Sequence, residues 1–374
     1  MVDRIKVMQL QQKYYVRETD LHEEIVKALP QADFDVTSVY MRDHPKLGEL
    51  ESVSEHVKYF DLSAKQMKGL RIKANKSLLQ YSSEEQFNVM ISHRFKPLDL
   101  MLKLNKKLNI PRCINVVHGF GDFDRFYRRA TLKRYLDERW RFVAVSNPVK
   151  DYLLDLKCGF NDGNVRVIKN AIDIDKAVAG LLSKAEARSR LGLNSTDYVF
   201  GTIGRLVKVK GQTYLLKAFS ETLQRLPHAK LVIIGDGGLS DELNKEVDQL
   251  GLSGKVLMAG HIESAYQLMS AFDVFVLPSL EEGFGLVLLE AMVAKLPVIA
   301  SQVGGVPDVV GESLGTLVEP ADVTALAEAM ITTSELSEVQ RNAEGERMFQ
   351  RLLNEYSTAD YKQAYRALID GRAW

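Results

Sequence analysis

The stretch that decides the fold runs from Asp273 to Ser301 and reads "DVFVLPSLEEGFGLVLLEAMVAKLPVIAS". An apolar run of strand length comes first, and a glycine-rich turn with two glutamates follows. A helical pattern then leads to a second apolar run. A strand, a helix and a strand in this order predict a βαβ unit, which is the building block of a parallel sheet.

The same alternation extends along the chain. Further strands are expected in "YVFGTIG", "AKLVIIGDGG" and "KVLMAGH", a series that starts near Tyr198. The first half repeats the pattern, with strands expected at Arg4–Leu10, Phe34–Tyr40, Phe87–Ser92, Cys113–His118 and Phe142–Val145. We therefore predict an α/β protein with two Rossmann-like, doubly wound parallel sheets in tandem.

The chain has 374 residues, 46% of them hydrophobic, which suits two domains of ordinary size. Between the two series of strands, the sequence becomes polar and alanine-rich near residue 175. We therefore predict domains at 1–175 and 176–354. Ligands of open α/β sheets bind outside the carboxyl ends of the strands, so we expect the site in the cleft between the domains.

Basic and acidic side chains both number 49, so net charge favours no particular partner, and no nucleic-acid partner is expected. Residues 1–165 carry a net charge of +6 (28 basic against 22 acidic), and the remainder carries −6 (21 against 27). The sequence contains no membrane-spanning apolar run or signal peptide, and its two cysteines, Cys113 and Cys158, lack metal-ligand spacing. We expect a cytoplasmic protein.

Two loops that follow expected strands carry charged side chains. In "GRLVKVKG", Gly204 allows a tight exit from the strand, and Arg205 and Lys210 lie near the start of a helix. Two cations beside a helix N-terminus suit a diphosphate, although a solvated basic loop is equally consistent. The second loop is the glycine-rich turn of the opening stretch. There and in the helix that follows, Glu282 and Glu290 can accept hydrogen bonds from sugar hydroxyls, or their negative charges can simply interact favourably with the helix dipole.

A third loop, "SQVGGVPDVV", is weak evidence alone. Together with "IIGDGG" and the two loops above, however, it resembles the retaining glycosyltransferases of the GT-B class, family 4, which carry two glutamates separated by seven residues. The resemblance implies that Glu290 holds the ribose of a nucleotide-sugar donor. It implies that Glu282, with Gly283 and the backbone of Phe284 and Gly285, holds the donor sugar, and that the Arg205/Lys210 pair holds the diphosphate.

The resemblance also assigns roles outside these loops. It implies that His118, at the end of "INVVHGFGDFD", faces the transferred sugar, and that the base is read near His261 and Ile262. His93 and Arg94 are candidates on the acceptor side. A C-terminal helix over 355–374 would pack back on the first domain.

The loop after the first strand, "LQQKYYVRETD", departs from the family pattern because it has no glycine pair. We expect Tyr14 or Tyr15 to form an aromatic wall there instead. Three Asp-x-Asp triplets occur, but none lies beside the Arg205/Lys210 pair, so we expect no required metal or other cofactor.

The segment Phe123–Phe142 contains seven cations and six aromatic residues. Phe123, Phe126, Tyr127 and Ala130 have helical spacing, with cations largely on another face, which suits either contact with an anionic membrane or an ordinary helix with a solvated basic face.

We predict a metal-independent, retaining hexosyltransferase that uses a nucleotide diphosphate sugar, with UDP favoured. The acceptor is expected to be a glycan or lipid-linked glycan, such as lipopolysaccharide core, at the inner face of the cytoplasmic membrane. A GT-B sugar-nucleotide epimerase or phosphorylase is the alternative. An NAD-dependent Rossmann enzyme is the third choice, since no Gly-x-Gly-x-x-Gly follows the first strand.

Overall fold

The computed structural model describes residues 4–16, 20–311 and 313–372. The chain forms two compact units. Unit 1 comprises Met1–Asn170 and Thr358–Trp374, and unit 2 comprises Ala171–Ser357. The chain therefore passes from one unit to the other twice, at residues 170–171 and 357–358.

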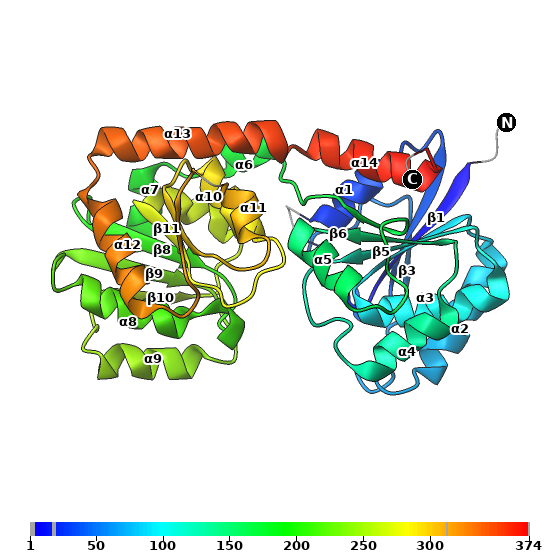
Figure 1. Ribbon diagram of the computed structural model, residues 1–374. Coiled ribbons are helices and arrows are strands. Elements are labelled where there is room, and N and C mark those ends of the chain that lie inside the picture. The colour runs from blue at the N-terminus through cyan, green and yellow to red at the C-terminus, as the bar shows by residue number, and fades with distance from the viewer. Residues whose placement is uncertain (1–3, 17–19, 312, 373–374) are drawn as a thin grey trace. The chain divides into compact units, whose positions relative to one another are not determined.

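Unit 1 is built on a parallel sheet with the strand order β3-β2-β1-β4-β5-β6-β7 (Figure 1). Its strands are β1 (Ile5–Gln11), β2 (Phe34–Tyr40), β3 (His56–Tyr59), β4 (Val89–His93), β5 (Arg112–Val117), β6 (Trp140–Ala144) and β7 (Val165–Val167). Its helices are α1 (Leu21–Lys27), α2 (Ile72–Glu85), α3 (Phe95–Leu108), α4 (Phe126–Tyr135), α5 (Asn147–Asp155) and α14 (Thr358–Asp370).

Unit 2 has a second parallel sheet with the order β10-β9-β8-β11-β12-β13. Its strands are β8 (Tyr198–Ile203), β9 (Ala229–Ile234), β10 (Val256–Gly260), β11 (Val274–Leu277), β12 (Val298–Ser301) and β13 (Thr316–Val318). Its helices are α6 (Ile174–Gly180), α7 (Lys184–Arg190), α8 (Gln212–Thr222), α9 (Ser240–Gln249), α10 (Leu286–Val293), α11 (Val306–Val310), α12 (Val323–Glu335) and α13 (Glu338–Glu355), with 3₁₀ turns η1 (Lys208–Lys210) and η2 (Ala265–Ala271).

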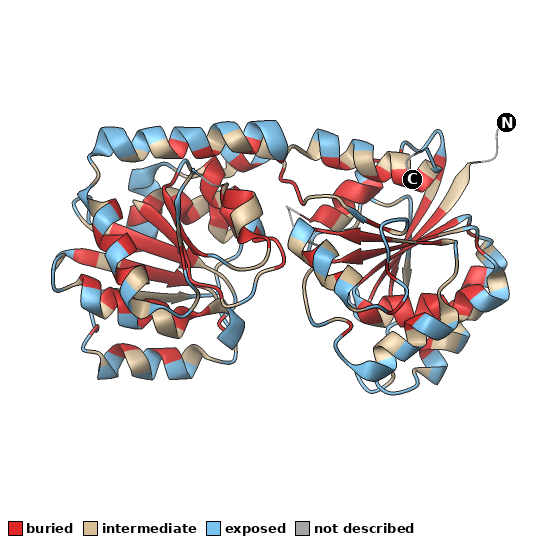
Figure 2. Ribbon diagram, in the orientation of Figure 1, coloured by how far each residue is buried: buried red, intermediate tan, exposed pale blue. Residues whose placement is uncertain are grey.

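Two doubly wound parallel sheets were predicted from the alternation of strands and helices, and the structure confirms them. The central strands β4 and β11 are buried along their whole length, because helices cover both faces of a parallel sheet (Figure 2). The edge strands β3 and β13 were missed. They are short and partly exposed, so they lack the continuous apolar run by which the central strands were recognised.

The prediction of one helical face through Phe123, Phe126, Tyr127 and Ala130 is wrong. Helix α4 begins at Phe126, and Phe123 precedes it as a fully buried residue that packs edge-on against Phe95 and Phe160. Phe126 and Tyr127 are exposed instead. Burial of Phe123 in the core fixes the chain before the helix can start, so the aromatic residues point in different directions.

Helix α14 packs within unit 1 against α1. The Tyr361 hydroxyl donates to the carbonyl oxygen of Leu21 at 3.3 Å, and Lys362 forms an ion pair with Glu24 at 2.8 Å. Tyr361 and the next tyrosine on this face, Tyr365, are buried. These contacts anchor the C-terminal helix to the start of the chain.

The two passages between the units are adjacent where they leave unit 2. Ile172 forms an isolated parallel bridge with Ser357, and its N–H donates to the carbonyl oxygen of Tyr356 at 3.1 Å. The buried Tyr356 ring lies 5.8 Å, centroid to centroid, from that of Phe284. Tyr356 thus connects the end of α13 to the turn before α10.

Among the described residues, no helix combines the length and the apolar character needed to cross a bilayer. The two cysteines, Cys113 and Cys158, are buried free thiols.

Helix α13 packs against the chain after α10 through Gly345. A Cβ at this position would lie 1.9 Å from the carbonyl oxygen of Lys295. Alanine normally stabilises a helix by about 1 kcal/mol relative to glycine. We expect the reverse for Gly345→Ala, a loss of about 1–3 kcal/mol in the free energy of unfolding, because the backbone of α13 must move.

Urea unfolding followed by circular dichroism measures this loss. Asn342→Ala, an exposed change on the same helix, serves as the control and should change stability by less than about 0.5 kcal/mol. A Gly345→Ala variant as stable as the wild type would show that the close packing of α13 is unimportant.

Candidate functional site

Three loops of unit 2 follow neighbouring strands of its sheet. They come after β8, β11 and β12, which are adjacent in the strand order. The carboxyl ends of adjacent parallel strands meet at one edge of a sheet, where α/β proteins bind their ligands. The sequence placed the candidate donor residues on these loops.

The first two loops pack against each other through their backbones. The N–H of Leu280 donates to the carbonyl oxygen of Val209 at 2.8 Å. Gly211, just before α8, has φ +69°, and a Cβ there would lie 1.9 Å from the carbonyl oxygen of Pro278. Only glycine fits, so the start of α8 lies directly against the chain that leaves β11.

An ion pair joins these two loops. The Lys210 ammonium contacts a carboxylate oxygen of Glu282, and both side chains are mostly buried, with 18% and 15% of their surface exposed. Ser279 donates to the same carboxylate oxygen at 3.4 Å. The structure therefore brings together two candidate residues that lie 72 positions apart in the sequence.

Arg205 lies on the same loop as Lys210 but is exposed, and no described residue pairs with its guanidinium group. The carbonyl oxygen of Arg205 accepts a hydrogen bond from the Gln212 side chain at 3.0 Å, which ties the loop to α8. The backbone here is therefore held while the cationic side chain stays available for an anionic ligand.

Gly204 was expected to allow a tight exit from the strand, but its backbone is not in the left-handed region. The tight approach comes from the loop after β9, where a Cβ on Gly235 would lie 1.9 Å from the carbonyl oxygen of Gly204. A Cβ on Gly204 itself would enter open space. That space beside the backbone next to Arg205 could take a ligand.

The turn before α10 is shaped by glycine. Gly285 has φ +90° and occupies the N-cap position of α10, where no side chain caps the helix. Phe284 is buried, and Glu290 is a half-buried residue in the fifth position of α10. The N–H of Gly305, on the third loop, donates to the backbone carbonyl of Glu282 at 3.0 Å. All three loops are thus linked through Glu282.

His261 and Ile262 follow β10 at the edge of the same sheet. His261 is exposed and Ile262 is half-buried. Strand β9 separates them in the strand order from β8, which the loop with Arg205 and Lys210 follows. Their assignment to base recognition stays a prediction.

In unit 1 the structure brings three histidines together. His93 ends β4 and His118 directly follows β5, and the Nδ1 atom of His93 lies 3.2 Å from the Nε2 atom of His118. His22, at the start of α1, places its ring 4.0 Å from that of His93, centroid to centroid. Asp20 caps α1 and contacts His22 Nδ1 at 2.8 Å.

His22 and Asp20 were not predicted from the sequence. The pattern that could have indicated them is the Asp-x-His start of a helix after the first strand. Such a helix begins at the same edge of the sheet as the loops that carry His93 and His118.

The environment keeps His93 and His118 uncharged. Burial lowers the pKa of both His93 and His118 well below the usual range, and the neighbouring His22 and Arg94 lower it further. Both imidazoles are therefore neutral at pH 7. A neutral His118 can donate or accept a hydrogen bond without adding positive charge beside a substrate.

The backbone next to His93 is strained. Arg94 has φ 66° and ψ 176°, a conformation that is usual only for glycine and that costs about 1–3 kcal/mol. Buried Asn115 holds the segment, because its side-chain amide donates to the carbonyl oxygens of Ser92 at 3.2 Å and of Arg94 at 3.4 Å. Strain that is held in this way is typical of functional positions.

Of the two tyrosines expected to form an aromatic wall, Tyr14 does not do so, and the role of Tyr15 stays a prediction. Tyr14 is buried against Tyr40 and Tyr59, and its hydroxyl donates to the carbonyl oxygen of Leu50, so it belongs to the core. Tyr15 is half exposed. The rest of this loop, Arg17–Thr19, lies outside the described residues.

Within the described part of the chain, two clusters have the side chains to hold a metal ion. The potential ligand atoms of His22, His93 and His118 all lie within 4.8 Å of one another, and Asp35, Glu55 and His56 form a second such group.

All three Asp-x-Asp triplets contain a residue with a structural partner. Asp173 caps α6, Asp124 accepts a hydrogen bond from Tyr152 at 2.7 Å, and Asp33 forms an ion pair with Arg366 at 3.0 Å. The prediction that no metal is required stays a prediction.

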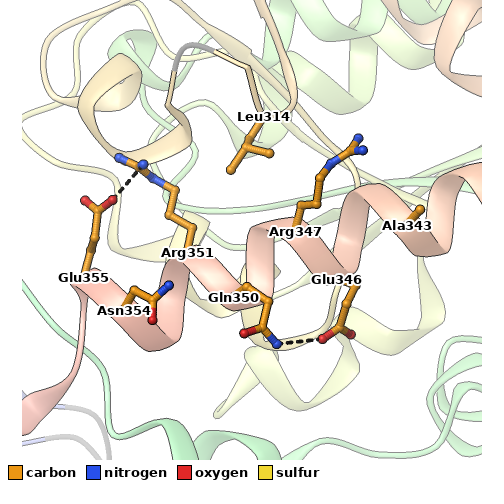
Figure 3. Close-up of a pocket in the computed structure, with 8 residues that line it drawn as sticks. All are labelled: Leu314, Ala343, Glu346, Arg347, Gln350, Arg351, Asn354 and Glu355. Atoms are coloured by element: carbon orange, nitrogen blue, oxygen red, sulfur yellow. Dashed lines mark hydrogen bonds and ion pairs between the residues drawn. The ribbon is translucent and has the colours of Figure 1, made fainter.

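A pocket of about 590 Å³ lies along α13 and contains none of the candidate residues. Figure 3 shows two pairs of lining side chains along the helix, Arg351 with Glu355 at 2.8 Å and Gln350 with Glu346 at 2.9 Å. These four side chains are thus engaged with one another.

Two family models match the chain. Residues 183–346 match the glycosyl transferases group 1, and residues 23–176 match the glycosyltransferase family 4.

Among curated proteins, the UDP-Gal:alpha-D-GlcNAc-diphosphoundecaprenol alpha-1,3-galactosyltransferase of Escherichia coli is 27% identical over 326 residues, which are 82% of each chain. A GDP-mannose-dependent monoacylated alpha-(1-6)-phosphatidylinositol monomannoside mannosyltransferase of Corynebacterium glutamicum is 33% identical over 155 residues, 40% of this chain and 41% of that protein.

Solved structures share the fold. The sucrose-phosphate synthase of Thermosynechococcus elongatus matches with a TM-score of 0.83 and 21% identity, over 98% of this chain and all of that one. HepE of Anabaena, in complex with UDP and glucose, matches with a TM-score of 0.82 and 20% identity over the same shares.

The lowered pKa values of His93 and His118 predict a pH dependence of stability. Below about pH 6.5 the unfolded chain takes up protons that the folded chain excludes, so the free energy of unfolding should decrease as the pH is lowered. The loss should approach about 1.4 kcal/mol per pH unit for each histidine. Asp20, His22 and Arg94 also face the cluster and contribute to its electrostatics.

Urea unfolding of the wild type and of His93→Gln across this range isolates the contribution of one imidazole. The variant should lose less stability on acidification. The exposed His228→Gln serves as the control and should behave like the wild type. Identical acid sensitivity of wild type and His93→Gln would contradict a buried neutral His93.

Proposed function

Because the chain belongs to the group 1 glycosyltransferases of family 4, which have the GT-B fold, and uses a nucleotide-sugar donor, we propose that it is a retaining hexosyltransferase. It transfers a hexose from a UDP-sugar to a hydroxyl of a growing, lipid-linked glycan. Lipopolysaccharide core is one acceptor of this class. No metal takes part in this proposal.

The observation that carries the proposal is the contact between Lys210 and Glu282 beside the unpaired Arg205. An ammonium, a guanidinium and a carboxylate gathered where parallel strands end suit a ligand that has both a diphosphate and sugar hydroxyls. In the absence of donor, each member of the ion pair neutralises the other. When donor binds, Lys210 can turn to the diphosphate and Glu282 to the sugar.

The other donor contacts follow from the loop geometry. Gly204 leaves room for the diphosphate beside its backbone, and no side chain caps the start of α10, where Gly283, with the backbone of Phe284 and Gly285, would contact the donor sugar. Glu290, within the same helix, would bind the ribose hydroxyls. His261 and Ile262 would contact the base.

The reaction breaks the bond between the anomeric carbon and the diphosphate oxygen. It forms a bond from the same face of that carbon to the acceptor oxygen, and the acceptor proton passes to the departing phosphate. The barrier lies in charge separation, so the main requirement is to stabilise the leaving group, a role for Arg205 and Lys210. A neutral His118 would contact the sugar near the reacting carbon without opposing its developing positive charge.

The choice of donor and acceptor rests on the relatives. The E. coli relative is named for a UDP-sugar donor and a diphosphoundecaprenol acceptor, and HepE was solved with UDP. The corynebacterial relative is named for GDP-mannose and a phosphatidylinositol derivative, so GDP is the competing donor nucleotide. Both named acceptors are lipid-linked, which favours a peripheral position on a membrane.

Donor turnover tests the overall proposal. Release of UDP from a UDP-sugar should require a glycan acceptor, and NMR of the product should show the donor's anomeric configuration. Release of UDP without any acceptor glycan would instead favour a sugar-nucleotide epimerase that hydrolyses its substrate. Phosphate-dependent formation of a sugar phosphate would favour a phosphorylase.

Removing either cation should impair the chemical step. We expect Arg205→Ala and Lys210→Ala to lower kcat by roughly two to three orders of magnitude, the effect of losing one donor that stabilises a developing anion. The control is Lys208→Ala, an exposed cation in the same 3₁₀ turn, which should retain activity. Near-normal turnover in both of the first two variants would refute their role.

Glu290→Ala should weaken nucleotide binding because an acceptor of the ribose hydroxyls is lost. In a thermal-shift panel of UDP, GDP, ADP, CMP and NAD(P), the matching nucleotide at a hundredfold excess over its Kd adds roughly 2.7 kcal/mol of stability. The shift should shrink in Glu290→Ala and persist in Glu281→Ala, an exposed neighbouring glutamate. A shift with NAD(P) alone would contradict the donor site.

A further inference from the structure

A basic pocket of about 380 Å³ lies in unit 1, and its lining contains none of the three clustered histidines. The turn before α2, the first half of α3, and α4 with the residue before it contribute its walls, and Figure 1 shows these helices together. Its lining contains one carboxylate, Asp99, and six cations: Lys68, Arg71, Lys96, Lys103, Arg125 and Arg128.

The single carboxylate cannot balance these cations. Asp99 is buried and already forms ion pairs with Arg71 and with Lys103, the latter at 2.8 Å. Arg125 donates to the phenol of Tyr127 at 3.1 Å, and Arg128 donates to the backbone carbonyl of Asp122 at 2.8 Å. Tyr127 is uncharged, and the Asp122 carboxylate, which interacts with Arg128, lies outside the lining, so the six cations of the lining still face one lining carboxylate.

The cations lie close enough to repel one another. Burial lowers the pKa of Lys96, and repulsion from Arg71, Arg42, Arg128 and Lys68 lowers it further. No described carboxylate pairs with Lys96. The Nε atoms of Arg71 and Arg128 are buried and have no hydrogen-bond partner among the described residues. A bound anion with several acceptor oxygens would satisfy these donors and relieve the repulsion.

Three exposed apolar side chains line the pocket or lie next to its lining in the sequence. Leu70, 76% exposed, and Tyr127, 45% exposed, belong to the lining, and Phe126 beside Tyr127 is 78% exposed. Arg128 stacks on the Phe95 ring at 4.6 Å, which holds its guanidinium group inside the pocket. A small soluble anion would leave the three apolar side chains in water, whereas a lipid would cover them with apolar material.

We propose that this pocket binds the phosphate group of an anionic membrane lipid, while Leu70, Phe126 and Tyr127 enter the boundary between headgroups and acyl chains. The inference deepens the membrane contact of the proposed function by naming its lipid group and its residues. It does not depend on the donor site of unit 2. The excess of cations supplies attraction to the anionic surface, and the pocket supplies selectivity for phosphate.

Co-sedimentation of the full chain with vesicles tests the proposal. We expect binding to phosphatidylcholine vesicles that contain phosphatidylglycerol, and weaker binding when oleate supplies the same negative charge without phosphate. Lys96→Gln should reduce binding to the phosphatidylglycerol vesicles about fivefold or more, the typical contribution of a cation at a membrane surface. Phe126→Ser should reduce it as well, since exposed apolar area is lost.

The matched control is Lys133→Gln, which removes the same charge from an exposed position on α4 outside the pocket and should have a smaller effect. Equal losses of vesicle binding in Lys96→Gln and Lys133→Gln would show that diffuse charge attraction, and not the pocket, causes the binding. Equal binding to phosphatidylglycerol and oleate vesicles would show the same. Binding of inorganic phosphate in calorimetry without any vesicle binding would overturn the lipid assignment.

A UDP thermal shift on the same variants separates this inference from the donor assignment. An unchanged shift in Lys96→Gln would show that the variant is folded and that its loss of vesicle binding is specific to the pocket. A different result is that UDP causes no thermal shift while Lys96→Gln still weakens vesicle binding. That result would support the lipid pocket and refute UDP as the donor nucleotide.

Discussion

The ion pair between Lys210 and Glu282 is the contact on which the candidate donor site of unit 2 depends. Each charge is mostly buried, so removing one partner would leave the other uncompensated at a cost of several kcal/mol. The close approach of Gly211 to Pro278 brings the two loops together, and the hydrogen bond from Gly305 to Glu282 adds the third. A change at any of these backbone contacts therefore alters the electrostatics of the whole site.

The candidate residues of unit 1 lie in a different electrostatic environment. His93 and His118 are neutral because burial disfavours their charged forms, and Asp20 orients the third histidine, His22. Unit 2 thus gathers full charges suited to a diphosphate, whereas this part of unit 1 presents uncharged imidazoles.

The fold was predictable because strands covered on both faces by helices must be continuously apolar, as "DVFVLPS" and "PVIAS" are. The loops that follow such strands were therefore identifiable, and with them Arg205, Lys210 and Glu282. Short edge strands such as His56–Tyr59 carry no such signal. His22 was missed because its position depends on tertiary contacts, and the helical face through Phe123 failed because core packing overrode periodicity. The chemical roles of the site residues remain predictions.

The bridge between Ile172 and Ser357 has a mechanical consequence. The two segments that link the units lie side by side where they leave unit 2 and are joined by this bridge. A force applied to one segment is therefore shared by the other. Next to this bridge is Tyr356, whose ring packs on Phe284 in the turn that precedes α10. A force on the two linking segments is thereby passed to the backbone of the turn before α10. A rearrangement of this turn is passed in the same way to the linking segments.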